Sequence, residues 1–315
     1  MEQAAAESVS NGAGHGAGRP WLAARAGGGL SSRIPSRVGW LLVPAVLLFL
    51  AFMVLPLLML GVLAFNPSVR GVLALSGEFT LDNFSKFFAS ALYHKSLITS
   101  LKLGLLTVIA TIVLGYPLAF IMARTPDKRI FTLLSVLVLA SMQLDMTIRL
   151  YGMITLFGNT NGLLNQLLTA IGLPALQLVY NSTGVVLGMV QFTLPFMVLS
   201  LIGLLINLNP TYEHAARSLG AGRWRAFWTV TFPLSLPAVI AGSVIVFSLS
   251  ISSYIVPVLL GSSRVPTLAT HLYQQISEMG IWQFGSAIAT ILFLASLLAI
   301  GLSFRVARRY AGARG

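Results

Sequence analysis

The sequence predicts an all-α integral membrane protein with six transmembrane helices. Of its residues, 56% are hydrophobic and only 9% are charged, whereas about a quarter of the residues in a soluble domain are charged. The mean hydropathy is +0.86. Six long apolar stretches alternate with polar connections, and a helix needs about 20 apolar residues to cross the hydrocarbon core. Lipid is therefore expected to surround most of the chain.

The six predicted spans differ in their charged residues. The first, fourth, fifth and sixth contain none, and the second has only Lys102, near an end where a long side chain can reach the interface. The third contains Asp145 and Arg149. The first stretch is too long for the apolar region of a signal peptide and reads as a transmembrane helix. The predicted spans are residues 39–65, 101–123, 130–157, 183–207, 233–260 and 284–304.

The basic residues predict the orientation of these spans. Fourteen of the 20 Lys and Arg residues lie in the N-terminal tail, the second and fourth connections and the C-terminal tail. Cytoplasmic segments carry the excess of Lys and Arg, so both termini are expected in the cytoplasm. Residues 1–38, rich in Gly, Ala, Ser and Arg, predict a disordered cytoplasmic tail. Residues 39–310 form the membrane domain, and 311–315 a short C-terminal tail.

The composition also excludes several functions. The chain has no cysteine, so it has no disulfide, thiolate metal site or cysteine nucleophile. Four His and eight acidic residues along 315 positions make a metal or acid–base cluster unlikely to assemble, so no catalytic residue, metal or cofactor is expected. The basic residues form short clusters between apolar runs, which argues against nucleic-acid binding. The chain also lacks a Gly-rich phosphate loop of the Walker type.

The fourth connection, residues 209–232, predicts two short helices joined at glycines. Asn209 and Pro210 suit a helix start. Gly220 and Gly222 are expected to end this helix before a second segment rich in aromatic residues. The connection therefore forms a helix–Gly–helix element on the cytoplasmic side.

The first of these helices carries small and apolar residues together. Ala215, Ala216 and Leu219 allow another backbone to approach closely, and the arginine and aromatic residues around them suit a protein contact. Glu213 and Arg217 stand four residues apart and predict a helical ion pair. An amphipathic loop at the membrane interface is the alternative interpretation.

The same connection resembles the signature loop of the ABC importer permeases, the inner-membrane components of binding-protein-dependent transport. That signature reads Glu-Ala-Ala, three residues, Gly, and then an apolar segment ending in Pro. His214 stands where the family has Glu, and Glu213 directly precedes it. The matching residues are Ala215, Ala216, Gly220, Ala221, Phe227, Val230 and Pro233.

In that family the loop forms a coupling helix, which docks into a groove of the ATPase subunit. The resemblance therefore implies an ATPase contact in which Glu213 or a protonated His214 replaces the usual glutamate. The residues expected to couple to the ATPase are Glu213, His214, Ala215, Ala216, Arg217, Leu219, Gly220 and Ala221.

Further strings along residues 40–309 resemble the spermidine/putrescine branch of this family. They are residues 79–84 (FTLDNF), 114–119 (LGYPLA), 148–151 (IRLY), 162–166 (GLLNQ) and 194–198 (LPFMV).

This resemblance implies the type I ABC importer permease fold and a non-catalytic transport subunit of the bacterial inner membrane. It also implies three protein partners: an ABC ATPase dimer, a second and related permease forming a heterodimer, and a periplasmic solute-binding protein. The expected solute is a polyamine. A permease for an opine, an amino-acid-like solute or another organic cation is the alternative. An ion-coupled secondary transporter would need more carboxylates within the spans than Asp145 provides.

Asp145 and Arg149 are the first candidates for the solute pathway. They lie four residues apart in the third span, and so are expected on one helix face. A charge at the bilayer centre costs about 2.5–3.5 kcal/mol on insertion scales, so both are expected to face water or the bundle interior. A mutually neutralising structural pair is the alternative. The other pathway candidates are Tyr151, Gln191, Ser252 and Tyr254.

Overall fold

The computed structural model describes residues 36–71, 77–159 and 162–312, and every regular element in these ranges is a helix. The predicted disordered tail, residues 1–38, lies almost wholly outside the described residues. The chain divides into two units, Met1–Leu55 and Pro56–Gly315. The first unit contains α1 (Ser36–Phe49) and a π-helical segment, Leu50–Val54.

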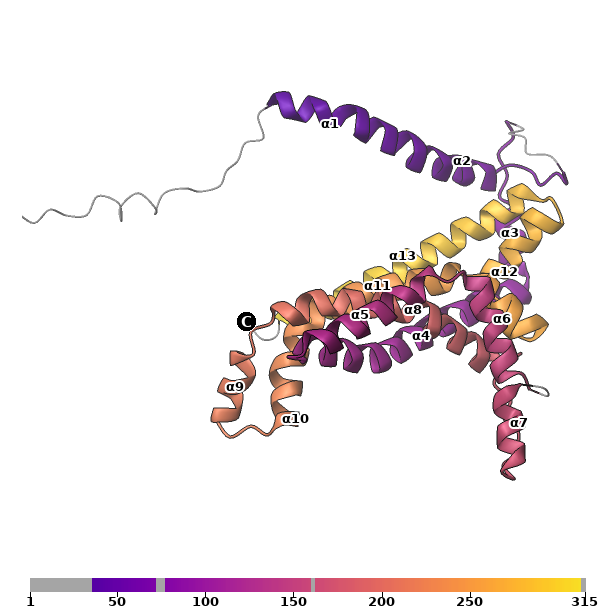
Figure 1. Cartoon of the computed structure of the whole chain (residues 1–315). Coiled ribbons are helices and arrows are strands. Elements are labelled where there is room, and N and C mark those ends of the chain that lie inside the picture. Colours follow the sequence, from indigo (N-terminus) through magenta and orange to yellow (C-terminus); the bar gives the residue numbers. More distant parts are fainter. Residues whose placement is uncertain (1–35, 72–76, 160–161, 313–315) are drawn as a thin grey trace, which may run out of the picture. The chain divides into compact units, whose positions relative to one another are not determined.

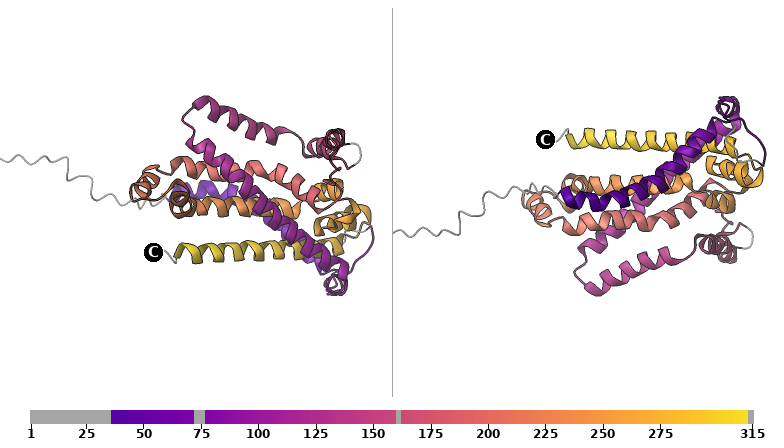
Figure 2. Two further views of the ribbon diagram at one scale, coloured as in Figure 1. Left: turned by 90° about the horizontal axis from the view of Figure 1, so that it is seen from below. Right: turned by 90° about the horizontal axis from the view of Figure 1, so that it is seen from above.

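The second unit holds the remaining helices, which Figures 1 and 2 show from three sides. Its first helix is α2, and by length and composition Val43–Ala64 is apolar enough to cross a membrane. The helices of the unit are α2 (Leu55–Ala64), α3 (Asp82–Ala89), α4 (Ala91–Arg124), α5 (Lys128–Gln143), α6 (Met146–Phe157), α7 (Leu163–Ala170), α8 (Ser182–Asn207), α9 (Thr211–Ser218), α10 (Arg223–Ala226), α11 (Phe232–Ser252), α12 (Leu268–Tyr273) and α13 (Trp282–Gly312).

Three long helices, α4, α8 and α11, pack against one another and form the centre of this unit (Figure 2). Met197 of α8 is fully buried between the other two helices. A Cβ atom added at Gly115 of α4 would lie 3.1 Å from the Met197 side chain, and one at Gly242 of α11 would lie 2.7 Å from its sulfur. Small residues at these positions therefore permit the close helix packing typical of membrane proteins.

The predicted spans agree with the helices except in the third and fifth. The predicted 183–207 corresponds to α8, and 101–123 and 284–304 lie within α4 and α13. Among the described residues, five helices are long and apolar enough to cross a membrane, and α5 and α6 together make a sixth candidate. The fifth span was expected to continue to residue 260, but α11 ends at Ser252. A separate π-helical segment, Pro257–Gly261, follows after a break.

The third span is broken rather than continuous, so the expectation of one helix over residues 130–157 is wrong. The chain bends by 102° between α5 and α6. The carboxylate of Asp145 accepts hydrogen bonds from the backbone N–H groups of Thr147 at 2.8 Å and Ile148 at 3.4 Å. An aspartate that caps a new helix in this way competes with continuation of the preceding one. Asp145 is therefore the cap of α6, and Arg149 lies one turn further along this short helix, where its backbone N–H donates to the Asp145 carbonyl at 3.2 Å.

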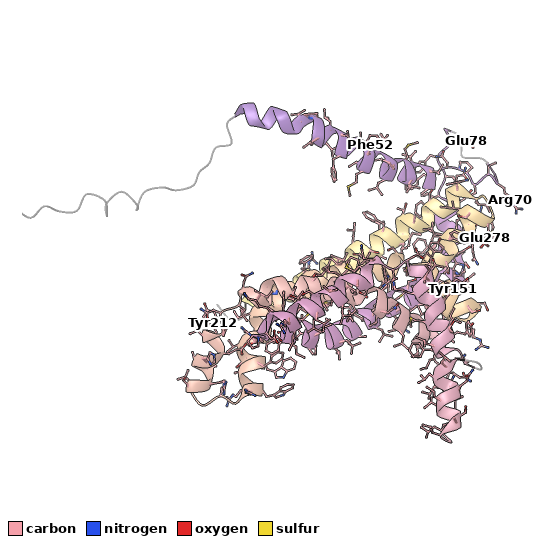
Figure 3. All side chains as sticks on the ribbon, in the orientation of Figure 1. Phe52, Arg70, Glu78, Tyr151, Tyr212 and Glu278 are labelled. Carbon is pink, nitrogen blue, oxygen red and sulfur yellow. The ribbon has the colours of Figure 1, made fainter. Side chains whose placement is uncertain are left out.

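The connections gather at two ends of the second unit. At one end, Arg124 in the second connection forms an ion pair with Glu213 in the fourth. At the other end, Gly71 of the first connection donates to Gly280 of the fifth, and Tyr180 of the third donates to Leu260. Figure 3 shows Tyr212 at the first end and Tyr151 toward the other. This alternation is what successive spans require.

Candidate functional site

The fourth connection folds into two short helices, α9 and α10, which lie side by side at one end of the second unit (Figure 1). The side chain of Asn209 accepts a hydrogen bond from the backbone N–H of Thr211 at 2.9 Å, as suits a helix start. Gly220 ends α9 with a φ of +87°. The predicted helix start and glycine stop are both confirmed. The pair of helices is called the α9–α10 hairpin below.

The turn of the hairpin is a Schellman motif. The N–H of Ala221 donates to the carbonyl of Ala216 at 3.1 Å, and the N–H of Gly220 donates to that of Arg217 at 3.0 Å. This pair of hydrogen bonds satisfies carbonyl groups that the end of a helix would otherwise leave unpaired. The motif needs a left-handed conformation at Gly220, which glycine adopts without the steric cost of a Cβ atom. The turn therefore has a defined geometry.

The tip of the hairpin exposes large apolar side chains. Leu219 is 90% exposed and Trp224 is 74% exposed. Tyr212 lies in the first turn of α9, at the other end of that helix, and is 58% exposed. Exposed large apolar side chains mark contact surfaces for other molecules. Of the residues expected to contact an ATPase, five are exposed and three are partly buried. The exposed residues are His214, Ala215, Arg217, Leu219 and Gly220, and the partly buried ones are Glu213, Ala216 and Ala221.

Glu213 does not pair with Arg217, contrary to the expectation from helical spacing. Its Oε1 atom lies 2.8 Å from Nη2 of Arg124, the last residue of α4. The same oxygen accepts a hydrogen bond from the hydroxyl of Thr231 at 2.7 Å. The carboxylate thus faces the helical core, and it leaves the charge of Arg217 exposed.

Aromatic side chains pack the base of the hairpin against α4. The ring of Phe227 meets Tyr116 edge to face at 5.5 Å and Phe120 at 5.7 Å. Trp224 stacks on Phe227 with 5.9 Å between the ring centroids. Tyr116 also forms a 2.8 Å hydrogen bond between its hydroxyl and that of Ser235 in α11. Edge-to-face pairs are favourable beyond their buried area, so this base is well anchored.

Sequence reasoning missed Arg124 and Thr231 as parts of this site. Arg124 contributed only to the count of basic residues, and Thr231 lies in an apolar segment that is expected to lead into the next span. Arg124 could have been found from its position at the end of a span, because a cation there interacts favourably with the helix dipole at the C-terminus. No local signal in the sequence indicates which carboxylate it contacts.

The six pathway candidates do not form one cluster. Among the described residues, no side-chain hydrogen bond or ion pair joins any two of them. Arg149 donates from Nη1 to the carbonyl of Ser141 at 2.9 Å, and its guanidinium lies 5.6 Å from the ring centre of Phe192. Tyr254 is 37% exposed and stacks on Tyr273 at 4.6 Å.

The remaining pathway candidates expose polar groups. Tyr151 is 58% exposed, and Gln191 is also exposed. Ser252 is exposed at the end of α11, where its hydroxyl donates to the carbonyl of Ser248 at 2.8 Å. Within residues 36–71, 77–159 and 162–312, no group of three His, Asp or Glu side chains is placed to hold a metal ion.

Comparisons with known proteins agree on one family. Residues 112–312 match the family described as "Binding-protein-dependent transport system inner membrane component". PotB, the spermidine/putrescine transport system permease protein of Escherichia coli K12, is 31% identical over 232 residues, covering 73% of this chain and 83% of PotB. PotB of Salmonella typhimurium LT2 is 30% identical over 232 residues, covering 73% of this chain and 80% of that protein. The molybdenum transport system permease protein ModB of Mycobacterium tuberculosis is 29% identical over 217 residues, covering 67% and 78%.

Two solved structures share the fold. A chain of a bacterial ABC transporter involved in the import of the acidic polysaccharide alginate matches with a TM-score of 0.71 at 17% identity, over 86% of this chain and 95% of that one. A chain of the MetNI methionine ABC transporter matches with a TM-score of 0.53 at 14% identity, over 68% and 94%. At these identities the likeness concerns the fold alone.

Proposed function

Because this chain belongs to the family of binding-protein-dependent transport system inner membrane components, the permeases of ABC importers, we propose that it passes a polyamine such as spermidine or putrescine across the bacterial inner membrane. A periplasmic binding protein delivers the solute. A separate ATPase dimer hydrolyses ATP, and a second, related permease completes the pathway as a heterodimer. The chain itself supplies no catalytic residue.

The observation that carries the coupling role is the exposed apolar tip of the α9–α10 hairpin. Leu219 and Trp224 are 90% and 74% exposed on an element that the rest of the chain holds firmly at its base. A rigid apolar projection of this kind suits insertion into a groove of another protein. We assign that groove to the ATPase, with residues 209–232 as the coupling loop.

The charge distribution supports a cytoplasmic position for the hairpin. The end of the second unit that carries Arg124 and Glu213 also carries the basic residues of the second and fourth connections. By the positive-inside rule this end faces the cytoplasm. The domain assignment follows from it: residues 39–310 form the membrane domain, and residues 1–38 and 311–315 are cytoplasmic tails.

Exposed polar side chains support a shared solute pathway. Gln191 and Ser252 lie in α8 and α11, yet both are exposed in the isolated chain. Polar side chains within spans favour a water-filled cavity or another subunit over lipid. We place both residues, with Tyr151, Tyr254 and Asp145, on the face toward the second permease. Arg149 is instead assigned a structural role, because its guanidinium is engaged by Ser141 and Phe192.

The solute assignment rests on similarity to PotB, and uptake in proteoliposomes tests it. The chain is reconstituted with the ATPase, second permease and binding protein of its transporter, and uptake of radiolabelled spermidine and putrescine is measured with ATP inside. ATP-dependent uptake supports the proposal. Uptake of an opine or an amino acid that spermidine does not compete with would show that the transported solute is not a polyamine. Uptake driven by an ion gradient without the ATPase would overturn the coupling role.

Cysteine labelling tests the orientation separately. Since the chain contains no cysteine, Ser218→Cys in α9 and Ser277→Cys at the opposite end can each be labelled alone. Both side chains are exposed. A membrane-impermeant maleimide added outside spheroplasts is expected to label position 277 and not position 218, and inverted vesicles should give the opposite result. Labelling of position 218 from outside would contradict the orientation.

A further inference from the structure

We infer that Arg124, Glu213 and Thr231 are positioning residues that fasten the α9–α10 hairpin to the three central helices, and that Glu213 acts through these internal contacts rather than by touching the ATPase. These three residues and the Leu208 carbonyl are called the Glu213 cluster below. The inference rests on the proposed coupling function of the hairpin and assigns one of its residues a different role.

The Glu213 cluster is built from three short contacts. Oε1 of Glu213 accepts hydrogen bonds from Nη2 of Arg124 at 2.8 Å and from the hydroxyl of Thr231 at 2.7 Å. The other terminal nitrogen of Arg124, Nη1, donates to the carbonyl of Leu208 at 3.2 Å. Charge-assisted hydrogen bonds of this length are stronger than bonds between neutral groups.

The other three members of the Glu213 cluster each lie at the end of a different central helix. Arg124 is the last residue of α4, and Leu208 directly follows α8. Thr231 immediately precedes α11, in the π-helical segment Phe227–Thr231. One carboxylate and one guanidinium therefore connect α9 to α4, α8 and α11, which are the helices that pack against one another.

The environment of the cluster favours a persistent contact. The side chains of Arg124 and Glu213 are 21% and 26% exposed, and Thr231 is fully buried. Salt screens exposed pairs strongly and buried pairs much less. The guanidinium also lies 5.8 Å from the ring centre of Phe120.

Thr231 departs from the usual behaviour of a helical threonine. Thr229, two residues earlier, donates its hydroxyl to the carbonyl of Arg225, four residues before it. Most of the described threonines within the long helices donate in the same local way, as Thr107 and Thr193 do. The hydroxyl of Thr231 instead crosses to Glu213, 18 residues away in the chain.

The cluster gives the hairpin a mechanical role. If an ATPase displaces the tip, the Glu213 cluster transmits that displacement to the ends of α4, α8 and α11 together. Without it, the tip can still bind the ATPase but moves with less effect on the spans. The ionisable side chains left for docking on α9 are His214 and Arg217, since both are exposed and Glu213 is engaged.

The experiment compares ATPase binding with transport in the reconstituted complex. Glu213→Gln removes the charge at nearly constant size, and Thr231→Val removes one donor. Both variants are expected to co-purify with the ATPase as the wild type does, while spermidine uptake per ATP hydrolysed falls about tenfold for Glu213→Gln and less for Thr231→Val. The control is Thr125→Val, which removes a hydroxyl next to Arg124 that lies outside the hairpin and bonds only within its own helix turn, to the Ile121 carbonyl. This variant should leave the uptake per ATP hydrolysed unchanged.

A charge exchange separates positioning from docking. The double variant Arg124→Glu/Glu213→Arg restores an ion pair within the chain and is expected to recover part of the coupling that either single reversal loses. An ATPase contact would not be rescued in this way. Lost ATPase binding in Glu213→Gln, or no recovery in the double variant, would overturn the inference.

The proposed function can fail independently of the Glu213 cluster. If the wild type binds no ATPase, the coupling function fails. If the wild type binds the ATPase but takes up no spermidine, only the solute assignment fails. The cluster is then tested without solute, by the ATP-dependent change in maleimide labelling of Ser277→Cys at the opposite end. Glu213→Gln is expected to abolish that change, and its persistence would overturn the inference.

Discussion

The guanidinium of Arg149 extends back across the break in the third span and donates to the carbonyl of Ser141, with 2.9 Å between the two atoms. This hydrogen bond joins the end of α5 to α6, and the guanidinium also lies 5.6 Å from the ring centre of Phe192 in α8. Asp145 caps α6 at the same bend. Both charges of the third span therefore shape the bend.

Arg149→Met is expected to destabilise the bend. It removes a charge-assisted hydrogen bond to a carbonyl that has lost its regular helical partner, a loss of about 1–3 kcal/mol. Arg149→Lys should retain part of this stability. Thermal unfolding of the purified complex in detergent measures the effect. A melting temperature unchanged in Arg149→Met would show that the hydrogen bond does not hold the bend.

Asp145→Asn tests whether the carboxylate acts on the solute or only on the bend. Asparagine caps helices about as well as aspartate, so the melting temperature should remain that of the wild type. If the carboxylate of Asp145 also attracts a cationic solute in the pathway, the KM for spermidine should rise severalfold. An unchanged KM would assign Asp145 to the bend alone, and Asp145→Ala, which cannot cap, serves as the destabilised comparison.

Gly220→Ala should weaken the hairpin turn. Its φ of +87° is disfavoured for a residue with a Cβ atom by about 1–2 kcal/mol. The expected result is a several-fold loss in the amount of ATPase that co-purifies. Gly222→Ala is the matched control, because Gly222 lies two residues away with a φ of −64° and neither glycine has an atom that would obstruct a Cβ. Equal effects of the two substitutions would contradict the role of the turn.

Gly188→Ala should disturb the contact between α8 and the segment after α11. An added Cβ would clash with Leu260 and lie 2.9 Å from Val256. Overpacking of this kind costs about 1–3 kcal/mol, so the melting temperature should fall. Gly203→Ala in the same helix meets no atom within 4 Å and should leave the melting temperature near that of the wild type. A wild-type melting temperature for Gly188→Ala would show that the segment moves aside freely.

Because of His271, the folded protein is expected to become less stable to unfolding as the pH falls below neutrality. Burial lowers the pKa of His271, although a hydrogen bond to Gln274 opposes the change. The unfolded chain then binds more protons than the folded one, so stability is fully present above the ordinary histidine pKa of about 6.5 and is lost as the pH falls below it. Its Nε2 atom is buried without a hydrogen-bond partner, which leaves an added proton unpaired.

Melting temperatures between pH 7.5 and 5.0 measure this dependence. The wild type should lose stability over that range, and His271→Gln should lose less. The control His214→Gln changes an exposed histidine in α9 and should follow the wild-type curve. Parallel curves for the wild type and His271→Gln would contradict a contribution from His271.

The number and order of the spans could be predicted from the sequence because hydrophobicity along a span is a local property. The predicted 183–207 differs from α8, Ser182–Asn207, by one residue at its start. The prediction of a continuous helix in the third span failed, because the break depends on a specific hydrogen-bonded cap rather than on hydrophobicity. Hydropathy averages over a window and passes over a single aspartate, whereas the cap that Asp145 provides depends on which backbone N–H groups its carboxylate meets.

The sequence by itself determined that this chain is a membrane protein of six spans with a helix–Gly–helix connection, because apolar length and glycine placement act within a few residues. Only the tertiary structure decided the partner of Glu213. Spacing favoured Arg217, but an exposed helical ion pair is worth only about 0.3–0.5 kcal/mol. Arg124, 89 residues away, offers a partly buried site with a second donor from Thr231. Long-range packing, which no local pattern encodes, brings these groups together.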